Sequence, residues 1–370
     1  MGPLDGFRII EIEGIGPCPF GGMLLADLGA EVIRVGRPEP SFLQASFDVM
    51  SRGKKSVTLD LKKPDGKAAL LKMVEFADAL IEGFRPGVME RLGIGPDVCL
   101  EANPRLVFGR MTGWGQDGPW AKRAGHDINY ISLAGALHAI GHKGQRPTVP
   151  LNLVGDFGGG GLLLAFGVVT ALLEAQKSGK GQVVDAAMVD GVAALMASIY
   201  AGMQQGFWSE KRGENLLDSG AAFYDVYETK DGKYISIGSL EPQFYKELLE
   251  KLDLVGKAPA PMDHLNPAKW NELRPTLTEI FLSKTRDEWD EVFDGSDVCY
   301  APVLAAAEVF EHEHHTARGS FVDIGGIKHA VAAPRFSRTK AADPKPAAER
   351  GADNEEVFAA CGITYPDPGE

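Results

Sequence analysis

The chain has 370 residues, of which 44% are hydrophobic and 24% are charged, so it can bury a substantial core, and its length suggests two domains. Its 51 acidic and 38 basic residues give a net charge of −13, which argues against nonspecific binding to nucleic acid. The N-terminus has no secretory pattern, and the longest apolar stretch, Leu162–Leu173, is too short to span a membrane. We therefore expect a cytoplasmic protein without membrane segments.

The first 115 residues alternate short apolar strands with helical segments. Helices are predicted at 20–28 and 64–77, and strands at 7–12, 31–35, 79–83 and 105–111. Strands separated by helices of this length indicate βαβ units and a mainly parallel, Rossmann-like sheet. Pro17 stands where a GxGxxG loop would follow the first strand. Because proline lacks the N–H that a pyrophosphate needs, the sequence argues against a nicotinamide cofactor.

The second half of the chain does not continue the alternation of short strands and helices. Two long apolar helices are predicted at 158–176 and 186–205, and a polar linker follows at 208–220. A hairpin is predicted over 222–238, with Asp231-Gly232 at its turn. Amphipathic helices are expected at 243–252, 270–281 and 286–292, and the tail after Lys340 is expected to be an extended wrap or partly loose.

Three acid/base residues lie at predicted helix starts: His126, Asp156 and Glu241. Each has a structural explanation, namely a packed histidine, an aspartate N-cap and a glutamate that favours the helix macrodipole. The glycines at 158–161, just after Asp156, are less ordinary, because each costs about 0.5–1 kcal/mol relative to alanine in a helix. They indicate that something bulky, a ligand or another backbone, approaches this helix start closely.

The cysteines and the basic residues are further candidate sites. The four cysteines lie far apart without metal-like spacing, so we expect reduced thiols and no metal site. A basic cluster crowds into thirty residues of this acidic chain, and two further arginines follow it. This cluster is either a site for a phosphate-bearing ligand or a set of solvated surface charges. Its members are Arg34, Arg37, Arg52, Lys54, Lys55, Lys62 and Lys63, followed by Arg85 and Arg91.

Several long blocks resemble the family III CoA-transferase fold proteins. They comprise residues 2–12, 14–17, 25–34, 52–62, 82–87 and 112–119. Within that family, the blocks 125–130, 151–160 and 241–245 are similar to the α-methylacyl-CoA racemase branch. The resemblance extends from residue 2 to about 340.

The resemblance implies an interlocked homodimer with an α/β fold. Each chain would have a Rossmann-like large domain with a mainly parallel sheet and a smaller α+β domain. The expected boundaries are 1–190 for the large domain, 191–221 for a linker helix and connection, 222–320 for the small domain and 321–370 for a return to the large domain. The active site would be composite, with His126 and Asp156 from one chain and Glu241 of the partner subunit.

The resemblance also implies that the substrate is an acyl-CoA and that no further cofactor is needed. The residues expected to bind CoA are Arg37, Arg52, Lys62, Arg85 and Arg91, and those expected near the acyl end are Asp127, Asn152 and Tyr224. Gly36, Gly155, Ser219 and Ala222 depart from residues common in the family. Ser219 and Ala222 border the expected acyl pocket, so they bear on acyl-chain preference.

The three acid/base residues suit proton transfer at the carbon next to a thioester. Inversion there needs one acid/base group on each face, and the two groups must start in opposite protonation states. Asp156 would serve one face and a His126–Glu241 pair the other, while helix-start N–H groups near His126 meet the enolate oxygen. Together with the resemblance, this pattern implies a racemase that interconverts (R)- and (S)-2-methylacyl-CoA.

Two alternatives remain. In a family III CoA-transferase, an aspartate at the position of Asp156 attacks the thioester as nucleophile. His126 favours racemisation, because transferases of this fold usually have an aromatic residue near that position. The second alternative is a non-catalytic acyl-CoA-binding protein, which would need the basic cluster but not the three acid/base residues together.

Overall fold

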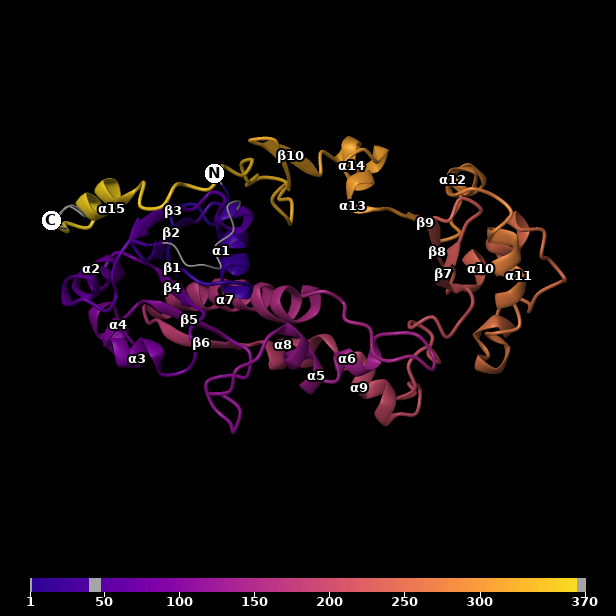
Figure 1. Ribbon diagram of the computed structural model, residues 1–370, viewed down its shortest axis with the longest axis horizontal. Coiled ribbons are helices and arrows are strands. Elements are labelled where there is room, and N and C mark those ends of the chain that lie inside the picture. Colours follow the sequence, from indigo (N-terminus) through magenta and orange to yellow (C-terminus); the bar gives the residue numbers. More distant parts are fainter. Residues whose placement is uncertain (1, 40–47, 365–370) are drawn as a thin grey trace. The chain divides into compact units, whose positions relative to one another are not determined.

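The computed structural model describes residues 2–39 and 48–364. The chain forms two compact units (Figure 1). The first contains Met1–Ala134, Pro150–Met196 and Thr316–Glu370, and the second contains Gly135–Val149 and Ala197–His315. Residues 135–149, which the sequence places in the large domain, therefore group with the second unit.

The first unit is built on a six-stranded sheet with the order β3-β2-β1-β4-β5-β6, and all neighbouring strands are parallel. This order, in which the chain works outward from β1 in one direction and then from β4 in the other, is that of the Rossmann fold. The predicted Rossmann-like parallel sheet is confirmed. The strands are β1 (Arg8–Ile12), β2 (Glu31–Gly36), β3 (Lys55–Thr58), β4 (Ala79–Glu82), β5 (Val107–Thr112) and β6 (Gln182–Ala187).

Helices cover both faces of this sheet and bury a hydrophobic core on each. Successive residues of β1 face opposite sides: Ile9 shares a core with Leu25 and Leu164, and Ile10 shares the other core with Leu70 and Phe358. The central strands read as continuous apolar runs because both of their faces are buried. The helices of these cores are α1 (Pro17–Asp27), α2 (Pro64–Val74), α3 (Val88–Leu92), α4 (Pro96–Ala102), α7 (Leu162–Ser178) and α15 (Asn354–Ala360).

One predicted helix differs from the structure, and one strand was not predicted. The predicted helix 186–205 is wrong at its start, because β6 runs to Ala187 and pairs with β5. The β-branched residues Val183 and Val184 of β6 favour a strand. The helical part is divided into α8 (Met188–Leu195) and α9 (Ala197–Gln204). Strand β3 was missed, because Val57 is its only hydrophobic residue.

The apolar helix predicted at 158–176 begins earlier in the structure and contains Asp156. A π-helical segment, η2 (Leu153–Gly161), leads directly into α7, so the helix spans 26 residues, Leu153–Ser178. By length and composition alone it could cross a membrane, but core helices pass the same test. One face of α7 is buried in the first unit, while Leu162, Phe166 and Leu173 remain exposed.

The C-terminal segment covers the outer edge of β3. The Ser56 N–H donates a hydrogen bond to Asp353 Oδ2 (2.7 Å), and the Thr58 N–H donates one to Asn354 Oδ1 (2.9 Å). In Figure 1 this yellow segment passes β3 on its way to α15. An edge strand presents unpaired N–H and C=O groups, and these side chains satisfy two of them. The tail is thus extended before it reaches α15, and the helix itself was not predicted.

We expect Asn354→Ala to lower the free energy of unfolding by about 1–2 kcal/mol, because it removes two hydrogen bonds to Thr58. The measurement is urea unfolding followed by circular dichroism. The exposed neighbour Glu355 provides the control, since Glu355→Ala should change stability by less than about 0.5 kcal/mol. Equal losses in the two variants would contradict the edge-covering role.

The second unit contains a three-stranded antiparallel sheet with the order β7-β8-β9. The predicted hairpin is confirmed, and Gly232 at its turn has a φ of 72°. Tyr227, Ile235, Phe281 and Trp289 belong to its core. Its main elements are β7 (Tyr224–Glu228), β8 (Tyr234–Gly238), β9 (Tyr300–Val303), α10 (Pro242–Lys251), α11 (Arg274–Phe281) and α12 (Arg286–Phe293).

The remaining elements are short. They are α5 (Asp127–Leu133), α6 (Ala136–Ala139), α13 (Ala306–Val309), α14 (Glu313–Arg318), β10 (Phe321–Ile324), β11 (Ile327–Ala330) and the 3₁₀ turns η1 (Val49–Ser51), η3 (Asp263–Leu265) and η4 (Pro267–Lys269).

Candidate active site

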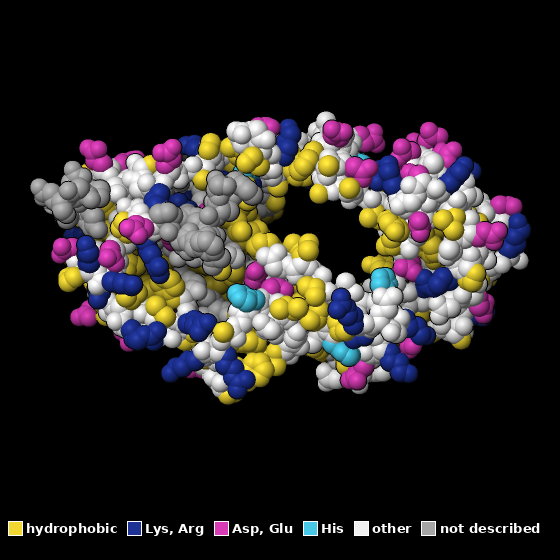
Figure 2. All heavy atoms as spheres, viewed as in Figure 1, with side chains coloured by type: hydrophobic (Ala, Val, Ile, Leu, Met, Phe, Trp, Pro, Cys, Tyr) yellow, Lys and Arg dark blue, Asp and Glu magenta, His cyan; other side chains and the backbone are white. Residues whose placement is uncertain are grey.

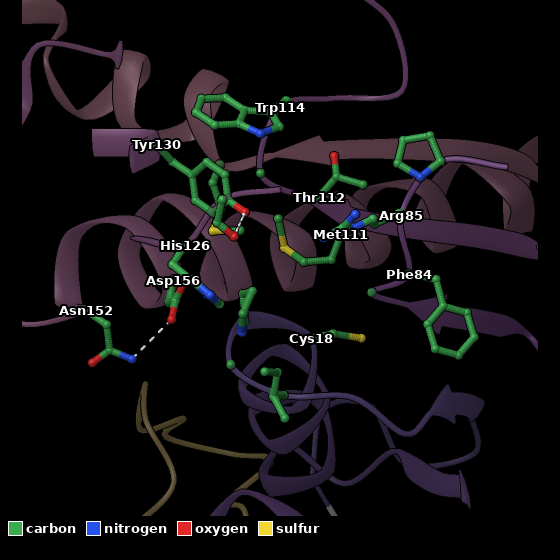
Figure 3. Close-up of a pocket in the computed structure, with 18 of the residues that line it drawn as sticks. Cys18, Phe84, Arg85, Met111, Thr112, Trp114, His126, Tyr130, Asn152 and Asp156 are labelled. Atoms are coloured by element: carbon green, nitrogen blue, oxygen red, sulfur yellow. Dashed lines mark hydrogen bonds between the residues drawn. The ribbon is translucent and has the colours of Figure 1, made fainter. Parts of the chain in front are cut away.

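A cavity of about 510 Å³ lies in the first unit, at the carboxyl ends of the central strands (Figure 3). Its wall includes residues 15–18 after β1, 83–86 after β4 and 111–114 at the end of β5. The strand order reverses between β1 and β4, and open α/β sheets bind ligands at such a switch point. His126 and Asp156 line this same cavity.

His126 is held at the entrance to α5. It is the N-cap residue of that helix, as predicted, and its backbone N–H donates a hydrogen bond to Asn129 Oδ1 (3.0 Å). Tyr130, one turn on, packs edge-to-face against Trp114 and donates its hydroxyl hydrogen to the Gly125 carbonyl. The exposed imidazole of His126 therefore stands on a well-fixed backbone beside the cavity.

Asp156 lies within η2, so the helix begins earlier than predicted and the residue is not simply a cap. Asn152 Nδ2 donates a hydrogen bond to Asp156 Oδ2 (3.2 Å, Figure 3). Burial raises the pKa of the Asp156 carboxyl, and the charge of Asp127 adds to this, whereas the Asn152 hydrogen bond and His126 lower it. A carboxylate whose pKa is raised is a stronger base for a weakly acidic carbon.

The glycines at 158–161 are explained by close backbone approach. A Cβ at Gly161 would lie 2.4 Å from the Pro17 carbonyl oxygen of α1, and one at Gly191 of α8 would lie 1.9 Å from the Gly159 carbonyl oxygen. Both distances are too short for any side chain. Of the two explanations offered by the sequence, the structure shows the second, another backbone, and this packing fixes the segment that carries Asp156.

Much of the basic cluster serves the fold. Lys54 Nζ lies 2.6 Å from Glu11 Oε2, and both side chains are almost fully buried. Arg52 binds Asp27 with two hydrogen bonds of 2.6 and 3.1 Å, and Arg34 donates to Ser51. Neither of the two explanations offered for the basic cluster, a phosphate site or solvated surface charges, applies to these buried residues. On the face seen in Figure 2, Lys and Arg are interspersed with Asp and Glu.

Four of the five residues expected to bind CoA are exposed: Arg37, Lys62, Arg85 and Arg91. Arg85 also lines the cavity. Arg52 differs, because its guanidinium is occupied by Asp27 inside the protein. Contact of these residues with CoA stays a prediction.

We expect Arg52→Ala to lower the free energy of unfolding by about 3–5 kcal/mol, because it leaves the buried Asp27 carboxylate without its partner. The measurement is urea unfolding. The control is Arg91→Ala, which should weaken CoA binding while changing stability by less than about 0.5 kcal/mol. An Arg52→Ala protein of normal stability but poor CoA affinity would show that Arg52 acts on the ligand.

Sequence reasoning missed Glu82, the buried last residue of β4. Burial raises the pKa of its carboxyl to about 7, although hydrogen bonds from the Phe84 N–H (2.7 Å) and Arg110 Nε (3.1 Å) oppose this. The Phe84 bond orients the loop that carries Arg85 into the cavity wall. An acidic residue closing an otherwise apolar strand was the available signal.

Glu241 and Tyr224 belong to the second unit, so their assignment to the site of His126 stays a prediction. Glu241 is the exposed N-cap residue of α10. The buried His264, also missed, lies 3.0 Å from the Leu240 carbonyl oxygen through Nε2 and stacks on Tyr245. These contacts hold the backbone next to Glu241.

The fold and the cavity define an α/β protein with two titratable side chains, His126 and Asp156, at the switch point of a Rossmann-like sheet. The family model of CoA-transferase family III matches residues 4–354, and the chain belongs to this family. The alpha-methylacyl-CoA racemase of Mus musculus is 44% identical over 340 residues, which cover 91% of this chain and 87% of that protein.

Two further comparisons extend this result. The succinyl-CoA–D-citramalate CoA-transferase of Chloroflexus aurantiacus is 31% identical and covers 96% of this chain and 93% of its own. The crystal structure of Rv3272 from M. tuberculosis has a TM-score of 0.81 at 29% identity and covers 96% of this chain and 98% of that one.

Proposed function

We propose that this protein is an α-methylacyl-CoA racemase, which interconverts (R)- and (S)-2-methylacyl-CoA by 1,1-proton transfer at C2. The observation that carries the proposal is that His126 and Asp156, two acid/base groups of different type, line one cavity. The 44% identity to a racemase supports it. The family relationship in turn supports an acyl-CoA as the substrate.

In the proposed mechanism Asp156 starts ionised and removes the C2 proton from one face, while a protonated His126 delivers a proton to the other. For the opposite substrate hand the two roles reverse. Glu241 of the partner subunit orients the imidazole. The Asn129 N–H donates to the His126 carbonyl (2.8 Å), so the enolate oxygen would be met by the earlier N–H groups of α5, those of Asp127 and Ile128.

We also propose that the enzyme is a homodimer. On α7, Leu162, Phe166 and Leu173 are 53–65% exposed and lie on one helical face. Large apolar side chains grouped in this way typically mark a protein contact. A second copy of the chain would cover them and supply the Glu241 that the mechanism requires.

The test is incubation of each 2-methylacyl-CoA epimer with the protein in D₂O, followed by chiral analysis. Deuterium at C2, with both configurations formed from either epimer, is the expected result. Exchange without inversion, or CoA passing to an added free acid, would replace racemisation by another activity. Binding of the thioester without exchange would leave only a binding protein.

A further inference from the structure

Asp127 is the residue after His126, but its side chain is directed elsewhere. The carboxyl group is buried, and Oδ2 accepts a hydrogen bond from the backbone N–H of Asp156 (2.8 Å). That N–H is in the first turn of η2, where helices leave donors unsatisfied. A side chain from α5 thus closes the start of the helix that carries Asp156.

The position of this carboxylate depends on Gly155. A Cβ at residue 155 would lie 2.3 Å from Asp127 Oδ2, so any side chain there would displace the carboxylate. The same Cβ would lie 3.1 Å from Cγ2 of Ile131. The absence of a side chain at Gly155 therefore leaves the space that Asp127 occupies.

The second carboxylate oxygen of Asp127, Oδ1, is unusual. Asp127 Oδ1 is buried and, among the described residues, has no hydrogen-bond partner. A buried acceptor without a partner is costly, and capping one N–H does not require a charged group. A serine or an asparagine would cap the helix more cheaply, so the retained carboxylate calls for a role beyond capping.

We propose that Asp127 is a positioning residue that ties the two acid/base groups together: its backbone continues from His126, and its carboxylate holds the backbone of Asp156. One hydrogen bond thereby sets the separation of the two groups across the substrate carbon. Since effective proton transfer depends on near-attack geometry, a displacement of about 1 Å can cost about 100-fold in rate. The inference rests on the proposed function.

The charge of Asp127 has a second consequence. A like charge near Asp156 disfavours its ionised form, and Asp127 is one cause of the raised pKa of that carboxyl. Removing this charge lowers the pKa of Asp156. Exchange by the ionised base would then persist to lower pH.

The test compares Asp127→Asn, which keeps an oxygen acceptor without the charge, with Asp127→Ala, which removes both. Asp97→Asn, on the exposed first turn of α4, is the control. We expect Asp127→Ala to lower kcat for C2 exchange by about 10- to 100-fold with KM within about twofold of the original. Asp127→Asn should keep most of kcat near neutral pH and move the acid limb of the pH profile to lower pH.

Several outcomes would overturn the inference. One is an Asp127→Ala protein with the original kcat. Another is an Asp127→Asn protein as slow as Asp127→Ala with an unmoved acid limb, which is expected of a merely structural residue. If Asp127→Ala does not fold, Gly155→Ala provides the second variant, because its methyl group displaces the carboxylate and should also lower kcat.

A readout without turnover separates this inference from the proposed function. The pKa of Asp156 can be followed by ¹³C NMR of its labelled carboxyl group in the original protein and in Asp127→Asn. If the original protein exchanges no C2 proton, the proposed function fails. In that case a lower Asp156 pKa in Asp127→Asn still supports the coupling, and an unchanged pKa overturns it.

Discussion

Replacing Asp156 by alanine is expected to lower kcat for racemisation by about 10²- to 10⁴-fold, and to lower C2 proton exchange to the same extent with the epimer whose proton Asp156 removes. Asp156 lines the cavity, and its raised pKa makes it a stronger base for removing the C2 proton. The change should leave folding intact, because the packing of η2 against α1 and α8 involves glycine backbone rather than this side chain.

The measurement is deuterium incorporation at C2 of that epimer, since a CoA-transferase that used Asp156 as nucleophile would also lose activity in a transfer assay. Asp156→Asn is the matched variant: it keeps the shape and the amide contact but cannot accept the proton, so it should be equally slow. A folded Asp156→Ala protein with undiminished exchange would refute the assignment of Asp156 as a base.

The sheet was predictable because its signal is local. Apolar runs such as 79–82, separated by helices that begin at proline, define βαβ units without any knowledge of tertiary contacts. Strand β3 lacked that signal. It is a four-residue edge strand, and its outer N–H groups are satisfied by Asp353 and Asn354, which lie almost 300 residues further along the chain.

The sequence marked His126 and Asp156, which line the cavity, but it did not mark the partners of the basic residues. The sequence shows that Arg52 and Lys54 are basic, but not that Asp27 and Glu11 neutralise them inside the protein. Those partners precede them by 25 and 43 residues, and no local pattern marks the pairing. Likewise, the contact from Asp127 to the backbone of Asp156 spans 29 residues and appears only once α5 and η2 are packed together.

Mixed dimers offer the sharpest expected result for Glu241. Chains carrying Asp156→Ala and chains carrying Glu241→Ala should each be almost inactive alone. If each site combines Asp156 of one chain with Glu241 of the partner subunit, a mixed dimer has one site with both substitutions and one with neither. Random re-pairing makes about half of the dimers mixed, so about a quarter of the original activity should return.

The matched control mixes Asp156→Ala chains with His126→Ala chains. His126 and Asp156 line the same cavity of one chain, so every site in that mixed dimer keeps one defect and no activity should return. Differently tagged chains, unfolded and refolded together, allow the mixed species to be purified and assayed by interconversion of the two epimers, which needs both acid/base groups. If Glu241 instead served the site of its own chain, the Asp156→Ala and Glu241→Ala mixture would also stay inactive, and the composite site would be refuted.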